Sequence, residues 1–189
     1  MKSNYSKYSD DELFQLMKSS EKKKSEAGFS ELYSRYSQRI YAYCLRVTGY
    51  PDDANDIFQE AFTKFFKNAK KNESIQNIPA FILVITRNLC LNYQRDKKVN
   101  VSFEDFNFST YDEGYEQKEL LDLIAKSLEL LDFEYKEAFI LRQYQGMSYK
   151  EIAEITSVSI SAAKNRFWRA KEKIKTILTP YLEDIEKMK

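Results

Sequence analysis

The stretch RQYQGMSYKEIAEITSVSISAAKNRFWRAKEKIK, residues 142–175, decides the fold of the C-terminal part of the chain. Ser148 followed by Glu151 is a capping box, which favours a helix that begins at this point. Residues 156–158 predict a turn, after which Ser159 or Ser161 can cap a second helix with an apolar residue every three or four positions. These apolar residues are Ile160, Ala163, Phe167, Ala170, Ile174 and Leu178. Two helices joined by so short a turn indicate a helix-turn-helix.

The second of these helices is strongly basic. Residues 159–175 carry six cations against one anion, whereas the whole chain has a net charge of only +1. Such a local excess is what neutralising nucleic-acid phosphates requires. Asn165 and Ser161 point away from the apolar face, where base edges would lie, and Arg166 and Lys171 lie beside it, within reach of phosphates. The candidate DNA-binding residues here are Ser161, Lys164, Asn165, Arg166, Arg169 and Lys171. A surface helix with a merely solvated basic face remains the alternative.

The composition excludes several classes of protein. The 189 residues support one or two small domains, and 43% hydrophobic and 31% charged residues indicate a folded chain. The longest apolar run, residues 80–85, is far shorter than the roughly 18 residues that suggest a membrane helix, and the N-terminus shows no signal peptide. We therefore expect no membrane insertion and a cytoplasmic location.

The chain carries few residues that could perform chemistry. It has no histidine and four glycines, and it shows no phosphate-binding loop and no activated nucleophile. Its two cysteines, Cys44 and Cys90, lie in helical patterns without paired ligand spacing, so we expect reduced packing residues and not a disulfide or a metal site. We expect no catalytic residues, no metal and no cofactor, and thus not an enzyme.

The hydrophobic pattern predicts an all-α fold of two small helical domains. In the first, residues 1–98, Asp10 caps a short helix through Ser19, and the polar stretch 20–25 precedes a long amphipathic helix that ends at Gly49. A phenylalanine-rich helix with one polar face follows, and Pro79 opens another helix with a basic end. Residues 99–118 carry five anions against one cation and predict a flexible acidic linker, and residues 119–189 form the helix-turn-helix domain.

Several segments, in this order and spacing, resemble the extracytoplasmic-function (ECF) type of bacterial sigma factor, a branch of the sigma-70 family. The resemblance covers nearly the whole chain. The matching segments are FSELYSRY (29–36), DDANDIFQEAF (52–62), residues 80–95 with TRNL (86–89) and YQR (93–95), GMSYKEIA (146–153), and residues 163–170. The chain departs from the family pattern at Ser157, where glycine is usual in the turn, and at Ala163, where a branched apolar residue is usual.

The resemblance implies partners and roles. Asp56, Gln59 and Glu60 would bind core RNA polymerase, and the loop 71–77 would capture a flipped base of the minus-ten promoter element. The DNA-binding residues implied in this domain are Lys71, Asn77, Arg87, Asn88, Arg95, Lys97 and Lys98. The helix-turn-helix would bind the minus-thirty-five element, and an anti-sigma factor would be a further partner.

The function implied is a sigma factor that binds core RNA polymerase, recognises promoter DNA and assists promoter melting. Two other classes of protein stay open on the residues alone. One is a stand-alone helix-turn-helix regulator that needs no polymerase, and the other is an enzyme with a DNA-binding tail. The absence of histidine and of any metal-ligand cluster in the sequence disfavours the enzyme.

Overall fold

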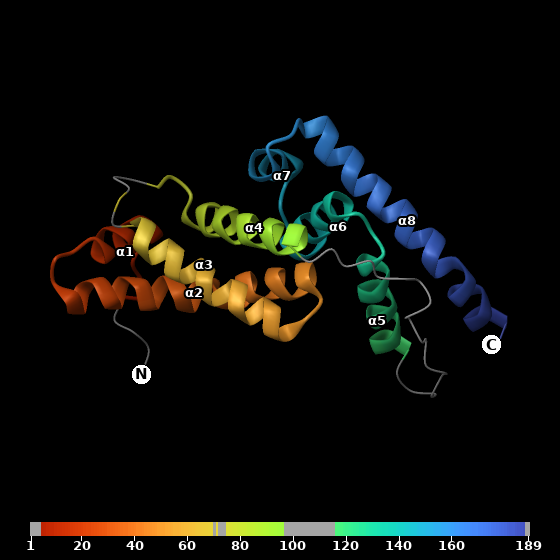
Figure 1. Ribbon diagram of the computed structural model, residues 1–189, viewed down its shortest axis with the longest axis horizontal. Helices are drawn as coiled ribbons and strands as arrows, with labels where there is room; N and C mark the ends of the chain where they lie inside the picture. The colour runs from red at the N-terminus through yellow and green to blue at the C-terminus, as the bar shows by residue number, and fades with distance from the viewer. Residues whose placement is uncertain (1–4, 70, 72–74, 97–115, 188–189) are drawn as a thin grey trace. The chain divides into compact units, whose positions relative to one another are not determined.

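The computed structural model describes residues 5–69, 71, 75–96 and 116–187, with the backbone alone described for 116–122 and 182–187. This described part contains helices and no strand, as the sequence predicts. The chain divides into two compact units, residues 1–97 and 98–189, and each is considered by itself. Figure 1 shows the helices of both units.

The first unit packs its helices around α2. The elements are α1 (Asp10–Met17), α2 (Lys22–Thr48), α3 (Pro51–Ala69) and α4 (Ile78–Asp96). Helix α2 contacts α1, α3 and α4, which are visible around it in Figure 1. The largest side chains sealed inside this unit include Tyr43, Phe65, Phe14, Leu32 and Ile82. The aromatic stripe expected on α3 is therefore buried, and its opposite side is left for solvent or a partner.

The first helix and the start of the second differ from the prediction. Ser9, and not Asp10, caps α1, because the Ser9 side chain accepts a hydrogen bond from the backbone of Glu12 and completes a capping box. Helix α2 begins at Lys22, so most of the polar stretch 20–25 is helical. Within that stretch, the buried Ser25 hydroxyl donates to the Met17 carbonyl at 2.7 Å. This prediction was wrong because the contact that orders the stretch comes from α1, which local polarity does not reveal.

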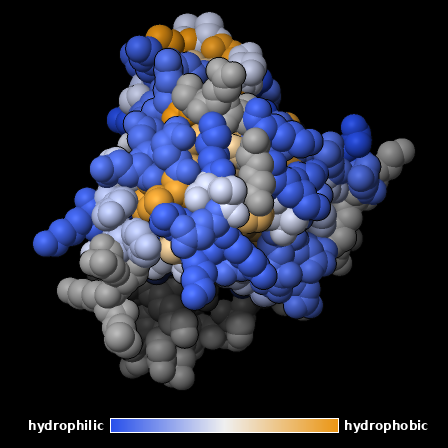
Figure 2. All heavy atoms as spheres, turned by 90° about the vertical axis from the view of Figure 1, so that its left-hand side faces the viewer, coloured by the Kyte–Doolittle hydropathy of each residue, from blue (hydrophilic) through white to orange (hydrophobic). Residues whose placement is uncertain are grey.

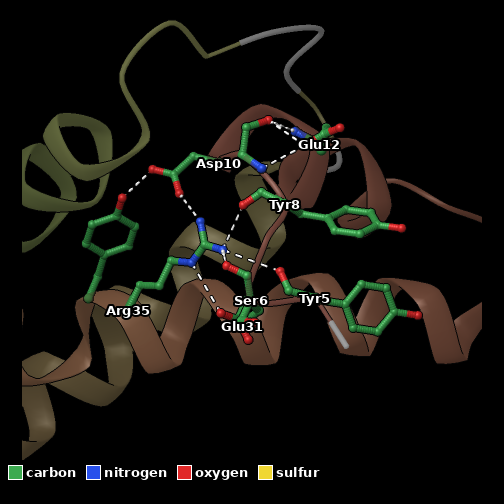
Figure 3. A network of polar contacts seen from close by, with 9 residues as sticks. Tyr5, Ser6, Tyr8, Asp10, Glu12, Glu31 and Arg35 are labelled. Atoms are coloured by element: carbon green, nitrogen blue, oxygen red, sulfur yellow. Dashed lines mark hydrogen bonds and ion pairs between the residues drawn. The ribbon is translucent and has the colours of Figure 1, made fainter. Parts of the chain in front are cut away.

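Two features fasten α1 against α2. At Gly28 of α2, a Cβ would lie only 2.6 Å from the Leu13 carbonyl oxygen, so the two backbones are as close as glycine allows. The Arg35 guanidinium forms an ion pair with Asp10 at 2.8 Å and with Glu31 at 3.3 Å. It also donates to the carbonyls of Tyr8, Ser6 and Tyr5, as Figure 3 shows. Burial lowers the pKa of Arg35, but the hydrogen bonds to Asp10 and Glu31 outweigh burial and raise it.

Tyr36, the next residue on α2, strengthens the same contact. Its hydroxyl donates a hydrogen bond to the Asp10 carboxylate. Burial, together with this hydrogen bond, raises the pKa of Tyr36 to about 12. The hydroxyl therefore stays protonated and remains a donor through neutral pH.

The second unit contains the expected helix-turn-helix. Its elements are α5 (Glu116–Glu129), α6 (Phe133–Phe139), a π-helical turn η2 (Ile140–Tyr144), α7 (Tyr149–Thr156) and α8 (Ile160–Lys187). The predicted capping box of Ser148 and Glu151 starts α7. Ser159 starts α8, since its hydroxyl accepts from the backbone of Ala162 at 3.1 Å, which decides between the two predicted caps.

The turn and the inner face of α8 follow the sequence pattern, except that Phe167 is half-buried and Ile160 is exposed. Ser157 ends α7 in the left-handed conformation with φ 56°, where the family usually has glycine. Ala163 and Ala170 are fully buried, and Ile174 and Leu178 are nearly so. Ile160 was predicted on this face but is 52% exposed, because as the first residue of α8 it precedes the part of the helix that packs on the core.

One face of the molecule is largely polar. The face seen in Figure 2 shows mostly hydrophilic side chains with small, separate hydrophobic patches. In the part of the chain that the structure describes, no helix is both long enough and apolar enough to span a membrane.

Candidate polymerase and nucleic-acid interfaces

The polar face of α3 holds the residues predicted to bind polymerase. Asp56, Gln59 and Glu60 are all exposed. Asp56 and Glu60 lie on the side of α3 opposite its buried phenylalanines, and Gln59 lies at the edge of this polar face, next to the phenylalanines. Glu60 forms an ion pair with Lys64 one turn later, at 2.9 Å. Because both members of this pair are about half exposed, the pair adds little to folding stability and can be exchanged for a partner's charges.

A hydrophobic groove adjoins this polar face, and the sequence did not reveal it. The groove has a volume of about 510 Å³, and its rim includes Gln59, Thr63 and Lys67. The aromatic rings that line it come from α2 and α3 and are Phe29, Tyr33, Phe58, Phe62 and Phe66. These rings pack edge to face, for example Tyr33 against Phe62 with centroids 4.8 Å apart. In the sequence, the aromatic residues of α2 and those of α3 form two separate stripes. Only the packing of the two helices shows that the stripes enclose one groove.

The exposed face of α4 carries part of the predicted minus-ten site. Asn88 and Arg95 are exposed, and Arg87 is half-buried. Asn92 is also exposed, and because it is four residues from Asn88 and three from Arg95, it shares their helix face. Sequence reasoning missed Asn92, although the same spacing would have found it.

The remaining residues predicted for this site precede or follow α4 in the sequence. Lys71 is exposed. The Asn77 side-chain oxygen accepts a hydrogen bond from the backbone of Ala80 at 3.0 Å, so this residue caps α4. Its side-chain oxygen is therefore engaged in the cap, while its NH2 group can donate to a base. Lys97 and Lys98, residues 72–74 of the predicted loop, and most of the predicted linker 99–118 lie outside the described residues.

Helix α8 presents most of its predicted DNA-binding residues to solvent. Ser161, Lys164, Asn165, Arg169 and Lys171 are exposed. No partner from the described part of the chain engages Lys164 or Lys171, so both charges are available for phosphates.

Three other cations of α8 have acidic or aromatic neighbours in α6 or at its N-cap. Arg166 is half-buried and pairs with Glu134 at 2.7 Å, and Lys173 pairs with Asp132 at 2.8 Å. The Arg169 guanidinium lies 3.4 Å from the Tyr135 hydroxyl. The structure thus separates Arg166, which has a carboxylate partner, from Lys164 and Lys171, which have none within the described residues. Sequence reasoning treated these three cations alike, because the pairing joins positions 32 residues apart.

The single tryptophan of the sequence lies on the side of α8 that is predicted to face DNA. Trp168 is 60% exposed, which is unusual for so large an apolar side chain. It lines a shallow groove of about 460 Å³ together with Ser161, Lys164, Asn165 and Lys171, and with Tyr149 and Phe167. Trp168 was absent from the predicted site, although its spacing of three residues from Asn165 and from Lys171 places it on the same face.

Possible metal ligands are not clustered in the described part of the chain. The described residues contain no group of three histidine, cysteine, aspartate or glutamate side chains that could hold a metal ion. Cys44 and Cys90 form no disulfide with any described residue, and both are fully buried. The described part of the first unit exposes polar faces on α3 and α4, and that of the second unit exposes a basic face on α8.

These two units correspond to two known protein families. Residues 32–99 match the family described as Sigma-70 region 2, and residues 121–174 match Sigma-70, region 4. RNA polymerase sigma factor SigZ of Bacillus subtilis (strain 168) is 30% identical over 151 residues, which cover 78% of this chain and 85% of that protein. The ECF RNA polymerase sigma factor SigW of the same organism is 23% identical over 169 residues, covering 82% and 90%.

The fold has a counterpart among solved structures. The sigma factor RpoE of Bartonella quintana, in complex with the anti-sigma factor NepR, superimposes with a TM-score of 0.64 at 24% identity, over 80% of this chain and 96% of that one. At this identity the likeness shows the fold alone. A stand-alone regulator is not favoured, because the region 2 match accounts for most of the first unit. The chain therefore belongs to the sigma-70 family, as an RNA polymerase sigma factor of the ECF type whose partners are core RNA polymerase and promoter DNA.

Proposed function

We propose a division of labour within this sigma factor: residues 1–98 bind core polymerase and the minus-ten element, residues 99–118 link the two domains, and residues 119–189 bind the minus-thirty-five element. As a sigma factor, the chain recognises promoter DNA for core RNA polymerase and assists promoter melting. The exposure of separate polar faces on α3, α4 and α8 supports the assignment of a separate contact to each.

Core polymerase binds the polar face of α3. The observation that carries this assignment is that Asp56, Gln59 and Glu60 share one exposed side of a helix whose other side is sealed in the core. None of the three is needed to fill the interior, so a partner can take their hydrogen bonds. The adjoining groove offers apolar area, which supplies affinity that exposed charges alone do not.

The minus-ten element contacts α4 and the segment that precedes it. Lys71, Arg87, Asn88, Arg95, Lys97 and Lys98 supply cations and an amide to backbone and bases, and Asn77 adds its free amide group. To keep the two DNA strands apart, the protein must hold unstacked bases. Polar pockets and a row of cations can hold them without covalent chemistry. The protein itself needs no catalytic activity, because the polymerase performs the reaction.

The minus-thirty-five element contacts α8. Ser161 and Asn165, near its N-terminus, face base edges, and Lys164, Arg169 and Lys171 face phosphates. Arg166 contributes less than these, because Glu134 already neutralises it. An anti-sigma factor is a further partner, in keeping with the complex in which RpoE of Bartonella quintana was solved. The protein works in the cytoplasm, where the polymerase is.

A charge-reversal experiment tests the assignment to α3. Asp56→Lys with Glu60→Lys should weaken binding to core polymerase and leave helical content unchanged, since both side chains are exposed. The matched control is Asp11→Lys, which reverses an exposed carboxylate on α1 and should leave core binding intact. Binding of the double variant at the wild-type level would remove α3 from the interface.

A further inference from the structure

Two side chains near the end of α4 hydrogen-bond to the corner between α2 and α3. The Tyr93 hydroxyl donates to the Asp53 carboxylate at 2.7 Å. The Gln94 side-chain amide donates to the Val47 carbonyl at 3.1 Å. Both bonds are partly buried, and they join residues 40 and 47 positions apart in the sequence. The C-terminal end of α4 is thereby tied to a part of the fold that is remote in sequence.

The corner that receives these bonds is held in a defined shape. Gly49 ends α2 in the left-handed conformation with φ 76°, and its N–H donates to the Leu45 carbonyl at 2.9 Å. The Thr48 hydroxyl is buried and donates to the Cys44 carbonyl at 3.0 Å. Helix α3 begins at Pro51, two residues after Gly49, and Asp53 lies in its first turn. Tyr93 and Gln94 therefore bind to a stable support.

The position of Tyr93 on α4 gives the bond a consequence for the exposed face. At 100° per residue, Tyr93 lies about 130° from the centre of the face formed by Asn88, Asn92 and Arg95, and Gln94 lies about 130° from it on the other side. The hydrogen bonds of Tyr93 and Gln94 therefore resist rotation of α4 about its own axis. The two bonds thus fix the direction in which Asn88, Asn92 and Arg95 point.

We propose that Asp53 and Tyr93 are positioning residues for the minus-ten element: their hydrogen bond holds the DNA-facing side of α4 in the orientation that captures the melted strand. Gln94 contributes through its bond to Val47. The inference rests on the proposed role of α4. It also separates the roles of Asp53 and Asp56, because Asp53 points toward α4, whereas Asp56 is exposed and available to polymerase.

The experiment uses the full chain assembled with core polymerase. Tyr93→Phe and Asp53→Ala each delete one end of the bond. Asp53→Asn is the conservative variant, because its amide oxygen can still accept from the tyrosine hydroxyl. Tyr36→Phe is the matched control, since it also deletes a hydroxyl that donates to a carboxylate in the same unit, but between α2 and α1.

Three quantities are compared for each variant: the affinity for core polymerase, the affinity of the holoenzyme for a single-stranded minus-ten oligonucleotide, and the rate of strand opening, followed by permanganate reactivity of thymines. Tyr93→Phe and Asp53→Ala should lower the last two by roughly tenfold, as expected for one hydrogen bond to a charged group. Core affinity should stay within about twofold of wild type, since the exposed α3 face is unchanged. Asp53→Asn should recover part of the loss, because its neutral amide oxygen accepts a weaker hydrogen bond than a carboxylate. Tyr36→Phe should behave as wild type.

Three results would overturn the proposal. Opening by Tyr93→Phe at the wild-type rate would show that the bond positions nothing. An equal loss in Tyr36→Phe would show a general effect of stability. Asp53→Asn as impaired as Asp53→Ala would show that the charge, and not the bond, matters. A wild-type holoenzyme that fails to bind the minus-ten oligonucleotide would instead refute the proposed role of α4 on which the inference rests.

Discussion

Replacing Lys171 by alanine should reduce the salt dependence of promoter binding, whereas removing Arg166 together with its partner should not. Lys171 is exposed and has no partner in the described part of the chain. Arg166 is held by Glu134 at 2.7 Å, and its side chain is only 25% exposed. A cation that already has a carboxylate partner releases few counterions when DNA binds, and a free one releases about one.

The size of the effect follows from the counterion release. Each phosphate contact adds about 0.9 to the slope of log affinity against log salt concentration. Between 50 and 200 mM salt, a fourfold change, one contact therefore accounts for about a 3.5-fold loss of affinity. Lys171→Ala should bind more weakly than wild type at low salt, and the difference should shrink by about 3.5-fold over this range. The weakening should be the same for all upstream sequences, because phosphates carry no sequence information.

The assay is a titration of holoenzyme onto a duplex with the upstream promoter element, at several salt concentrations. The matched control is the double variant Arg166→Ala with Glu134→Ala, which removes both members of the pair and leaves the net charge unchanged. Its slope should equal that of wild type. The double variant could instead reduce the slope as much as Lys171→Ala does. That result would mean that Arg166 leaves Glu134 to contact DNA, and it would refute the distinction between Arg166 and Lys171.

Three further predictions concern single residues. Trp168 is the sole tryptophan, so its fluorescence should be quenched or shifted when a duplex carrying the upstream element covers the indole, and Trp168→Ala should weaken binding by about 1 kcal/mol; unchanged emission on saturation would place Trp168 outside the interface. Arg35→Met should lower the free energy of unfolding, measured in urea, by about 2 kcal/mol and should speed hydrogen exchange in α1, because Asp10 and Glu31 lose their partner. The control Lys23→Met, on the same helix, should have neither effect. Ser157→Gly should raise stability by about 0.5 kcal/mol, since glycine adopts the left-handed conformation without strain, and a lower melting temperature would contradict this reasoning.

The sequence determined the features that depend on neighbouring residues. The capping box of Ser148 and Glu151 and the turn at 156–158 were predicted because caps and turns join residues only a few positions apart. The buried stripe on α3 and the exposure of Asp56, Gln59 and Glu60 were predicted because helical periodicity assigns a residue to the inner or outer side. The family membership followed from the order and spacing of such segments.

Tertiary structure decided the features that join distant residues. The pairing of Arg166 with Glu134, the bond of Tyr93 to Asp53 and the network around Arg35 link residues 25 to 40 positions apart. No periodicity encodes such pairs, because any cation can meet any carboxylate until packing brings two helices together. The same packing made residues 22–25 helical, and it encloses the groove between α2 and α3. A helix pattern shows which side of each helix is free, but only the packed fold shows which of its charges already have a partner.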